Sequence, residues 1–386
     1  MKHTVVMTGA SRGIGRVAAE HILRRSPDVH LLVVARDSSG ARLAAELAAG
    51  GHTVPHVPAD LGSPDSVRRA ATEIRDRLDR GDLPPLRGFV GNAGIQYTNA
   101  LTEGADGFEA TFTVNVLANH LFVRLLQDRF AAPARIVITV SDTHFGDFRH
   151  NLGMMPGPAW TSPDTLARTG AFTRPDTPAG GRTAYSTSKL AAIYLVHAYA
   201  RRLPAGTDAV AYNPGFVPGT GLARNAGPVS RFAMRRIMPV MTLTPFATGR
   251  NTAGRHLADV VLRTTPAPTG SYVDAAAWTV RRTSPTTRGA RTNSGRSPNG
   301  SPRVRSSGSR LPYRSPEPVA RDRDAPVVRD VPRAYPAAEI AGDSVERAHF
   351  RPGAAWCAYS GRYCRSSLWW LCRRGVPRTT ARASGS

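Results

Sequence analysis

Cysteine is scarce in this sequence and is confined to its last part. The three cysteines are Cys357, Cys364 and Cys372, so the first 280 residues contain none. That long stretch therefore has no disulfide framework and no cysteine metal site. A reducing compartment suits such a composition, and we expect the protein to be cytoplasmic.

Long apolar runs are also missing. No uninterrupted apolar stretch approaches the ~20 residues that a membrane-spanning helix needs. The N-terminus begins with a short strand pattern and a glycine turn, which leaves no room for the apolar stretch of a signal peptide. We expect a protein that is not exported and has no membrane partner.

Acidic residues are few, and their shortage is uneven along the chain. The sequence has 28 acidic residues against 51 basic ones, a formal net charge of +23. Residues 1–280 hold 30 basic and 21 acidic side chains, whereas residues 281–386 hold 21 and 7. Most of the positive charge therefore lies in the last quarter.

The segment 281–386 has the composition of a low-complexity tail. Arg, Pro, Ser and Gly dominate it and periodic apolar positions are almost absent, so we expect it to be disordered. One hypothesis is a gene read out of frame from near residue 288; the other is a basic tail that binds nucleic acid or an acidic surface. We favour the first and do not expect nucleic acid as a partner. Either way, a chain ending near residue 285 should keep its activity.

Short β-branched runs alternate with amphipathic stretches over residues 1–280. This alternation predicts a parallel sheet covered by helices on both faces, as one doubly wound α/β domain of the Rossmann type. The expected strands are residues 3–8, 31–35, 54–57, 88–91, 135–140, 209–212 and 271–274, and the expected helices include 14–25, 63–80, 106–130 and 183–203.

Lysine is rarer still, and its one interior position is informative. Only Lys2 and Lys189 are lysines, and Lys189 stands four residues after Tyr185 in Tyr-Ser-Thr-Ser-Lys. On a helix this spacing places the ammonium beside the phenol. A nearby cation favours the phenolate and lowers a pKa that starts near ~10. Tyr185 is therefore a candidate general acid or base.

A glycine-rich turn directly follows the first expected strand. The segment Thr8-Gly9-Ala10-Ser11-Arg12-Gly13-Ile14-Gly15 leads into a helix. Glycines let the backbone approach a pyrophosphate, whose charge is met by the N–H groups and dipole of the helix N-terminus. The spacing Gly-x-x-x-Gly-x-Gly in this context favours a dinucleotide site.

The end of the second strand predicts which dinucleotide binds. An acidic residue there accepts the ribose 2′-hydroxyl of NAD, whereas an arginine accommodates the 2′-phosphate of NADP. Here Ala35 is followed by Arg36, and Arg12 adds a cation from the glycine loop. A planar guanidinium suits phosphate, which favours NADP(H). In the alternative interpretation Arg36 is a solvated surface residue and Asp37 is the ribose ligand.

Three motifs together carry a family resemblance: the glycine loop, Asn92-Ala93-Gly94 after the fourth strand, and the Tyr185–Lys189 pair. On these motifs, residues 1–280 resemble the short-chain dehydrogenase/reductase family. The resemblance implies a catalytic set of Asn115, Ser141, Tyr185 and Lys189. In this implied set, the serine holds the substrate carbonyl and the tyrosine donates the proton. The lysine lowers the tyrosine pKa and also holds the nicotinamide ribose. The asparagine supports a water molecule. The implied cofactor contacts also include Asp60 and Leu61 at the adenine, Asn92, Ala93 and Gly94, Pro214 and Gly215, and Thr220, which falls one residue late. Homodimers or homotetramers are implied as well.

The chain departs from that pattern between Ser141 and Tyr185. Residues 143–182 form a long insertion rich in Pro, Gly and Thr, with six Met, Phe or Trp side chains: Phe145, Phe148, Met154, Met155, Trp160 and Phe172. Long irregular segments in a compact domain are often binding loops, and Met with aromatics suits an apolar ligand. We expect a second wall at residues 216–241. The alternative is a surface insertion without a ligand.

The sequence thus predicts an NADP(H)-dependent oxidoreductase that interconverts a bulky lipophilic ketone or aldehyde and its alcohol. The branches that it broadly resembles are retinol-dehydrogenase-like and polyketide-tailoring ketoreductases. Two alternatives stay open: an NADP-binding sensor or scaffold without turnover, and a nucleic-acid binder acting through the tail. His120 and His144 have no partner at metal-ligand spacing, so no metal is expected.

Overall fold

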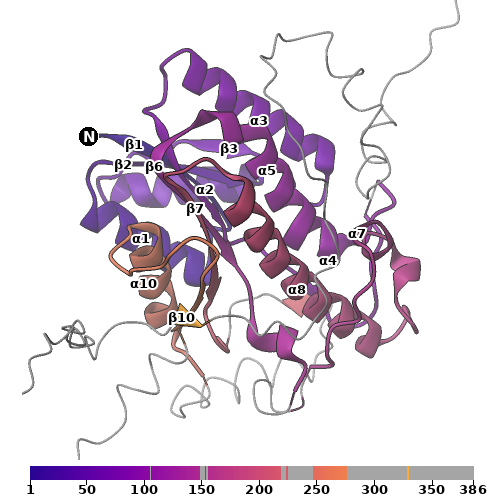
Figure 1. Ribbon diagram of the computed structural model, residues 1–386. Helices are drawn as coiled ribbons and strands as arrows, with labels where there is room; N and C mark the ends of the chain where they lie inside the picture. The colour runs from indigo at the N-terminus through magenta and orange to yellow at the C-terminus, as the bar shows by residue number, and fades with distance from the viewer. Residues whose placement is uncertain are drawn as a thin grey trace, which may run out of the picture.

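Seven parallel strands form the centre of the molecule (Figure 1). The computed structural model describes residues 1–104, 106–147, 153, 155–218, 223–224, 247–275 and 328–329. The sheet has the order β3-β2-β1-β4-β6-β7-β9, and a short β10 pairs antiparallel with β9 at one edge. The strands are β1 His3–Thr8, β2 Val29–Ala35, β3 His56–Pro58, β4 Leu86–Gly91, β6 Phe130–Thr139, β7 Thr207–Asn213, β9 Tyr272–Asp274 and β10 Val328–Arg329. β5 Gln96–Tyr97 and β8 Ala223–Arg224 form a separate two-stranded pair.

Helices cover both faces of the sheet. α1 Gly13–Arg25, α2 Asp37–Ala49 and α10 Arg250–Val261 share one apolar cluster on the first face. α3 Pro64–Asp79, α5 Ala118–Leu126 and α8 Pro178–Arg202 share another on the second face, and Figure 1 shows the two groups apart. Because both faces are covered, the strands read as nearly continuous apolar runs, as in β2 where Leu31 to Val34 are all buried.

Local signals fix the ends of the helices. Ser63 caps α3 by accepting a hydrogen bond from the backbone N–H of Ser66 at 3.4 Å. Thr177 caps α8 in the same way and is followed by Pro178 at the first helical position, so this helix begins five residues before the predicted residue 183. None of the helices in the described residues combines the length and apolarity needed to cross a bilayer.

The strand order places a topological switch point between β1 and β4. Connections from β1 proceed outward to β2 and β3, whereas those from β4 proceed the other way to β6, β7 and β9. In sheets of this type a ligand binds outside the carboxyl ends of the strands at that point. The predicted Rossmann-type doubly wound fold is confirmed.

Some of the predicted boundaries were wrong. β6 begins at Phe130, not at residue 135, and the predicted helix 106–130 is α4 Ala110–Phe112, a π-helical turn Thr113–Leu117 and α5 in succession. The insertion contains a short α7 Pro163–Leu166 and a 3₁₀ turn Thr169–Ala171. The domain limit at residue 280 and the predicted disorder of 281–386 fall outside the described residues, except for β10.

Candidate active site

The glycine turn after β1 has the backbone conformation that its sequence predicts. Gly9 and Gly13 have φ of +70° and +63°, in the left-handed region that favours glycine. A Cβ on Gly15 would lie 2.1 Å from the carbonyl oxygen of Gly9. These glycines therefore let α1 start directly against the end of β1.

The N-terminus of α1 fits an anion such as a pyrophosphate. Arg12 is the N-cap residue and gives no side-chain cap hydrogen bond, and the first turn holds no acidic side chain. This turn, which includes Ser11 and Ile14, lies at the carboxyl edge of the sheet. It is next to the topological switch point between β1 and β4. The helix dipole and the first N–H groups thus offer positive charge where a dinucleotide phosphate would lie.

Asn92 connects three strands around the glycine turn. Its Nδ2 donates to the carbonyl oxygen of Gly9 at 3.0 Å, and its Oδ1 accepts a hydrogen bond from Thr139 Oγ1 at 3.2 Å. The N–H of Ala93 donates to Thr8 Oγ1 at 3.1 Å. The residues 92–94 therefore hold the ends of β1, β4 and β6 together beside the predicted cofactor.

Three further predicted cofactor residues follow β2 and β3. Arg36 is exposed and is the N-cap residue of α2. Asp60 Oδ1 accepts a hydrogen bond from the N–H of Gly62 at 3.0 Å, and Leu61 packs against the apolar cluster below α3. The side chain of Asp37, the alternative ribose ligand, lies outside the described part of the chain.

Ser141, Tyr185 and Lys189 come together at the carboxyl end of β6. Ser141 stands two residues beyond that strand, and the other two lie on α8. The phenol of Tyr185 shares a side-chain hydrogen bond with Ser141. Lys189 Nζ lies 5.6 Å from the centroid of the Tyr185 ring and donates to the carbonyl oxygen of Thr139 at 2.9 Å. The structure thus brings together three of the four predicted catalytic residues.

Burial sets the protonation of this cluster. Tyr185 and Lys189 are 5% and 4% exposed, so each loses stabilisation of its charged form. Burial raises the pKa of Tyr185, opposed by its hydrogen bond with Ser141, and the charge of Asp142 raises it further. Burial lowers the pKa of Lys189 to about 8. The sequence-based prediction that the ammonium lowers the Tyr185 pKa is therefore outweighed by burial, and the phenol is protonated at neutral pH.

Asn115 lies in the π-helical turn and connects two elements of the site. Its Oδ1 accepts from the N–H of Ile95 at 2.9 Å. Its Nδ2 donates to the carbonyl oxygen of Ile95 and to Ser188 Oγ, both at 3.0 Å. Asn119 Nδ2 donates to the carbonyl oxygen of Asn115 at 2.9 Å. Asn115 thus connects the loop after β4 to α8 at Ser188, the residue before Lys189. Its role in supporting a water molecule stays a prediction.

The turn after β7 is held in place by a hydrogen bond to the neighbouring strand β9. Asn213 Nδ2 donates to Asp274 Oδ1 at 3.3 Å, and Asn213 Oδ1 accepts from the N–H of Gly215 at 3.1 Å. These bonds fix Pro214 and Gly215 at the carboxyl edge of the sheet. Thr220 and most of the predicted second wall, residues 216–241, lie outside the described residues.

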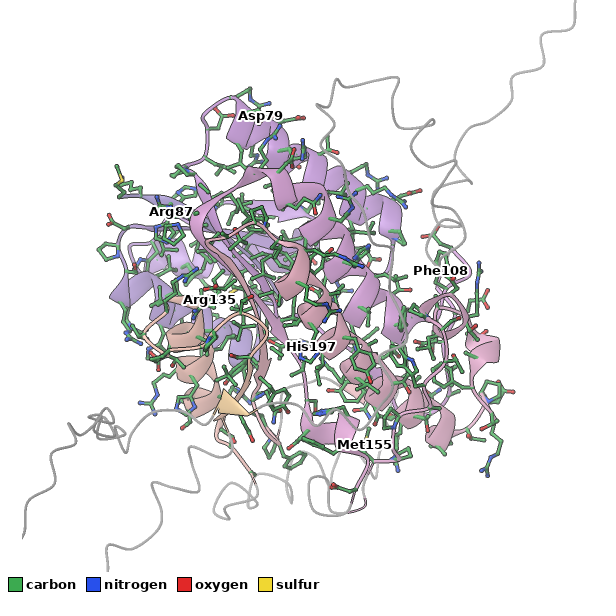
Figure 2. All side chains as sticks on the ribbon, in the orientation of Figure 1. Asp79, Arg87, Phe108, Arg135, Met155 and His197 are labelled. Carbon is green, nitrogen blue, oxygen red and sulfur yellow. The ribbon has the colours of Figure 1, made fainter. Side chains whose placement is uncertain are left out.

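The insertion is folded against the domain in the residues that the structure describes. Figure 2 shows Phe108, which precedes α4, beside the position of α7, and Met155 of the insertion at the bottom of the view. Phe172 is 6% exposed, and Trp160 packs edge-on against Tyr194 with ring centroids 4.7 Å apart. The Phe145 ring lies 4.0 Å from that of His144. Phe148 and Met154 lie outside the described residues.

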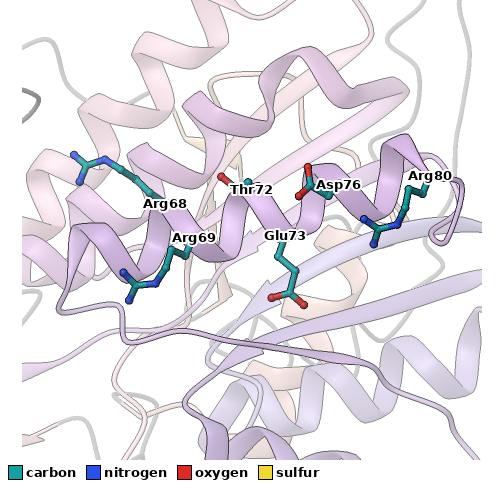
Figure 3. A pocket seen from close by; sticks show the side chains of 6 residues that line it. All are labelled: Arg68, Arg69, Thr72, Glu73, Asp76 and Arg80. Atoms are coloured by element: carbon teal, nitrogen blue, oxygen red, sulfur yellow. The ribbon is translucent and has the colours of Figure 1, made fainter. Parts of the chain in front are cut away.

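A surface hollow lies on α3, away from Ser141, Tyr185 and Lys189 (Figure 3). Its lining is Arg68, Arg69, Thr72, Glu73, Asp76 and Arg80, all from α3 and its C-cap. Side chains of one helix do not converge on a ligand from several directions, as those of a binding site do. We assign it no role.

Two site residues were missed from the sequence. Asp142 follows Ser141 directly, with its Oδ1 3.5 Å from Ser141 Oγ, and Thr139 gives its carbonyl oxygen to Lys189. Both residues lie close to Ser141 in the segment Thr-Val-Ser-Asp. Their position next to the expected serine is the sequence feature that could have predicted them. The long-range bond of Asn213 to Asp274 had no signal in the sequence.

Comparison with known proteins shows a family similarity over the first part of the chain. Residues 3–151 match the family model described as short chain dehydrogenase. A short-chain dehydrogenase of Talaromyces variabilis is 38% identical over 152 residues, which cover 36% of this chain and 41% of the relative. Over residues 3–151 the chain is similar to the short-chain dehydrogenase/reductase family. Retinol dehydrogenase 13 of Homo sapiens is 31% identical over 233 residues, covering 58% of this chain and 61% of the relative. The chain therefore spans less than two thirds of either relative.

A solved structure shares the fold described above. The blue fluorescent protein from a metagenomic library, solved in complex with NADPH, has a TM-score of 0.50 and 21% sequence identity. The likeness covers 70% of this chain and 95% of that protein. It supports the architecture described above.

Proposed function

We propose that this protein is an NADP(H)-dependent short-chain dehydrogenase/reductase that interconverts a carbonyl compound and its alcohol. The observation that carries the proposal is the cluster of Ser141, Tyr185 and Lys189 at the carboxyl edge of the sheet. This cluster stands beside a glycine turn and a helix N-terminus that fit a dinucleotide phosphate.

The chemistry of reduction assigns a task to each side chain. The nicotinamide, when bound, supplies the hydride. The Ser141 hydroxyl holds the carbonyl oxygen, and Tyr185, protonated at neutral pH, gives its proton to the negative charge that develops there. Lys189 carries a positive charge below about pH 8 and stabilises the phenolate that remains. In the oxidative direction the same phenolate accepts the alcohol proton.

Arg36 supports NADP(H) as the cofactor. It follows β2 at the carboxyl edge and is exposed, so its guanidinium can reach a phosphate beyond the strand end. Arg12 begins α1 in the adjacent turn. Replacement of Arg36 by an acid is the sharpest test of this preference.

A bulky lipophilic carbonyl compound is the substrate class that we propose. The insertion begins beside the site: Phe145 follows Ser141 by four residues, and its ring is tilted against that of the buried His144. The human relative is named retinol dehydrogenase 13, which agrees with the branch that the sequence resembles. A ring-rich wall favours apolar ligands over small polar ones.

The test is turnover of a carbonyl panel by the full chain. Aromatic and long-chain ketones and aldehydes are assayed beside small polar carbonyls, each with NADPH and NADH. We expect turnover with NADPH and a higher kcat/KM for the lipophilic compounds. Tight NADPH binding without turnover of any compound would instead support the sensor or scaffold. Equal or better use of small polar carbonyls would refute the substrate class.

A further inference from the structure

The catalytic helix has no exposed face over its central turns. Every residue from Ala184 to Ile193 is buried, including polar residues such as Ser186 and Thr187. A helix that covers one face of a sheet ordinarily keeps an outer, solvent-exposed stripe. Something therefore covers the outer side of α8.

Part of the cover is a segment of the insertion, and the rest comes from α4 and the π-helical turn, which share an apolar cluster with it. The N–H of Ala159 donates to Thr187 Oγ1 at 3.0 Å, and Trp160 packs edge-on against Tyr194 at 4.7 Å between ring centroids. Ala184 and Ala191 share an apolar cluster with members of the same segment, namely Leu166, Ala167 and Phe172. We call residues 157–177 the clamp segment.

The clamp segment is itself anchored to the domain on its far side. The N–H of Leu101 donates to the carbonyl oxygen of Pro175, and the N–H of Glu109 to that of Ala167, both at 2.8 Å. The guanidinium of Arg168 lies 4.8 Å from the centre of the Phe108 ring. The segment thus bridges the loop before α4 and the outer face of α8.

The contacted side of α8 is opposite the catalytic side. Ala184, Thr187, Ala191 and Tyr194 follow the spacing i, i+3, i+7 and i+10, which forms one stripe. At about 100° per residue, Tyr185 and Lys189 lie roughly 160° around the helix from that stripe. A force on the stripe therefore presses the catalytic pair toward Ser141 and Thr139 at the end of β6.

We propose that the clamp segment positions the catalytic pair, with Trp160 and Thr187 as its positioning residues. The proposal rests on the proposed function, because the distance that it controls is the one from Tyr185 and Lys189 to the reacting oxygen. Trp160 and Tyr194 are both half-buried, so loss of the large ring removes van der Waals contacts that restrain this side of the helix and lets it shift or move more.

The experiment combines amide hydrogen exchange with kinetics on the full chain. Trp160→Ala removes the ring, and Trp160→Phe keeps an aromatic edge against Tyr194. Thr187→Val keeps the shape but removes the acceptor of the Ala159 N–H. Thr72→Val, at an exposed position of α3, is the matched control.

In Trp160→Ala we expect exchange of the α8 amides 184–193 to accelerate at least about tenfold, with α1 and α10 unchanged. A displacement of about 1 Å can lower a rate by up to a hundredfold, so kcat should fall by about tenfold to a hundredfold while the Kd for NADPH changes less than about twofold. Thr187→Val should show a smaller effect of the same kind, and Trp160→Phe should recover most of the rate.

Three results would overturn the clamp: unchanged exchange in α8, equal acceleration throughout the domain, or accelerated exchange in α8 with an unaltered kcat. If the wild-type chain turns over no carbonyl, the proposed function fails, but local exchange still decides whether the segment restrains α8.

Discussion

The protonation of Lys189 gives a quantitative prediction about reduction. Burial lowers its pKa from 10.5 to about 8, which corresponds to roughly 3 kcal/mol against the charged form. The ammonium is therefore about 90% populated at pH 7 and about 10% at pH 9. Because kcat/KM reports the groups of the free enzyme, reduction should lose about tenfold in kcat/KM between these pH values.

The assay follows NADPH oxidation at 340 nm over pH 6 to 10 with one ketone. Activity is fully present below pH 7, where Lys189 is charged, and declines as pH rises through 8. Lys189→Arg keeps its charge throughout, since an arginine is not deprotonated in this range, so its lower activity should stay flat. A wild-type profile that is flat to pH 10, or an identical decline in Lys189→Arg, would refute the assignment.

Two further predictions concern arginines. Arg36→Glu should raise the KM for NADPH by about tenfold to a hundredfold, because it removes a charge-assisted hydrogen bond and adds repulsion, while the KM for NADH changes little; Arg42→Glu on the same helix is the control, and equal effects on both cofactors would contradict the preference. Arg135→Met should lower the free energy of unfolding by about 1–3 kcal/mol in urea titrations, since this 7% exposed side chain donates to Asp208, which keeps Arg263 as a partner, and to the carbonyl oxygens of Val260 and Ala267. The exposed Arg42→Met should cost under about 0.5 kcal/mol, and a similar small loss for Arg135 would show that the buried network is not stabilising.

Local patterns in the sequence were sufficient for the sheet and for the position of most site residues. The β-branched runs predicted all seven parallel strands, and the glycine turn, Ser141 and the pair on α8 all lie at the predicted edge. These features depend on spacing within a few residues of the chain. The ends of strands in a parallel sheet then meet at one edge by topology alone.

What could not be predicted depends on tertiary contacts. The pKa of Tyr185 is set mainly by burial, which the spacing of Tyr185 and Lys189 does not contain. The π-helical turn at Asn115 is accompanied by bonds to Ile95, twenty residues earlier, and to Ser188, far along the chain. The Pro- and Gly-rich composition of the insertion predicted an irregular binding loop, but it did not predict that Trp160 packs against Tyr194 of α8.

The most direct test of the account is the rate of hydride transfer in Tyr185→Phe. This change removes the proton donor and keeps the ring, so binding of NADPH should be retained while the single-turnover rate of ketone reduction falls by about 10²- to 10⁴-fold. Tyr199→Phe, the same change at a phenol near the end of the same helix that bonds to His120, should leave that rate within about twofold. A Tyr185→Phe enzyme that reduces ketones at the wild-type rate would contradict the proposed role of this hydroxyl.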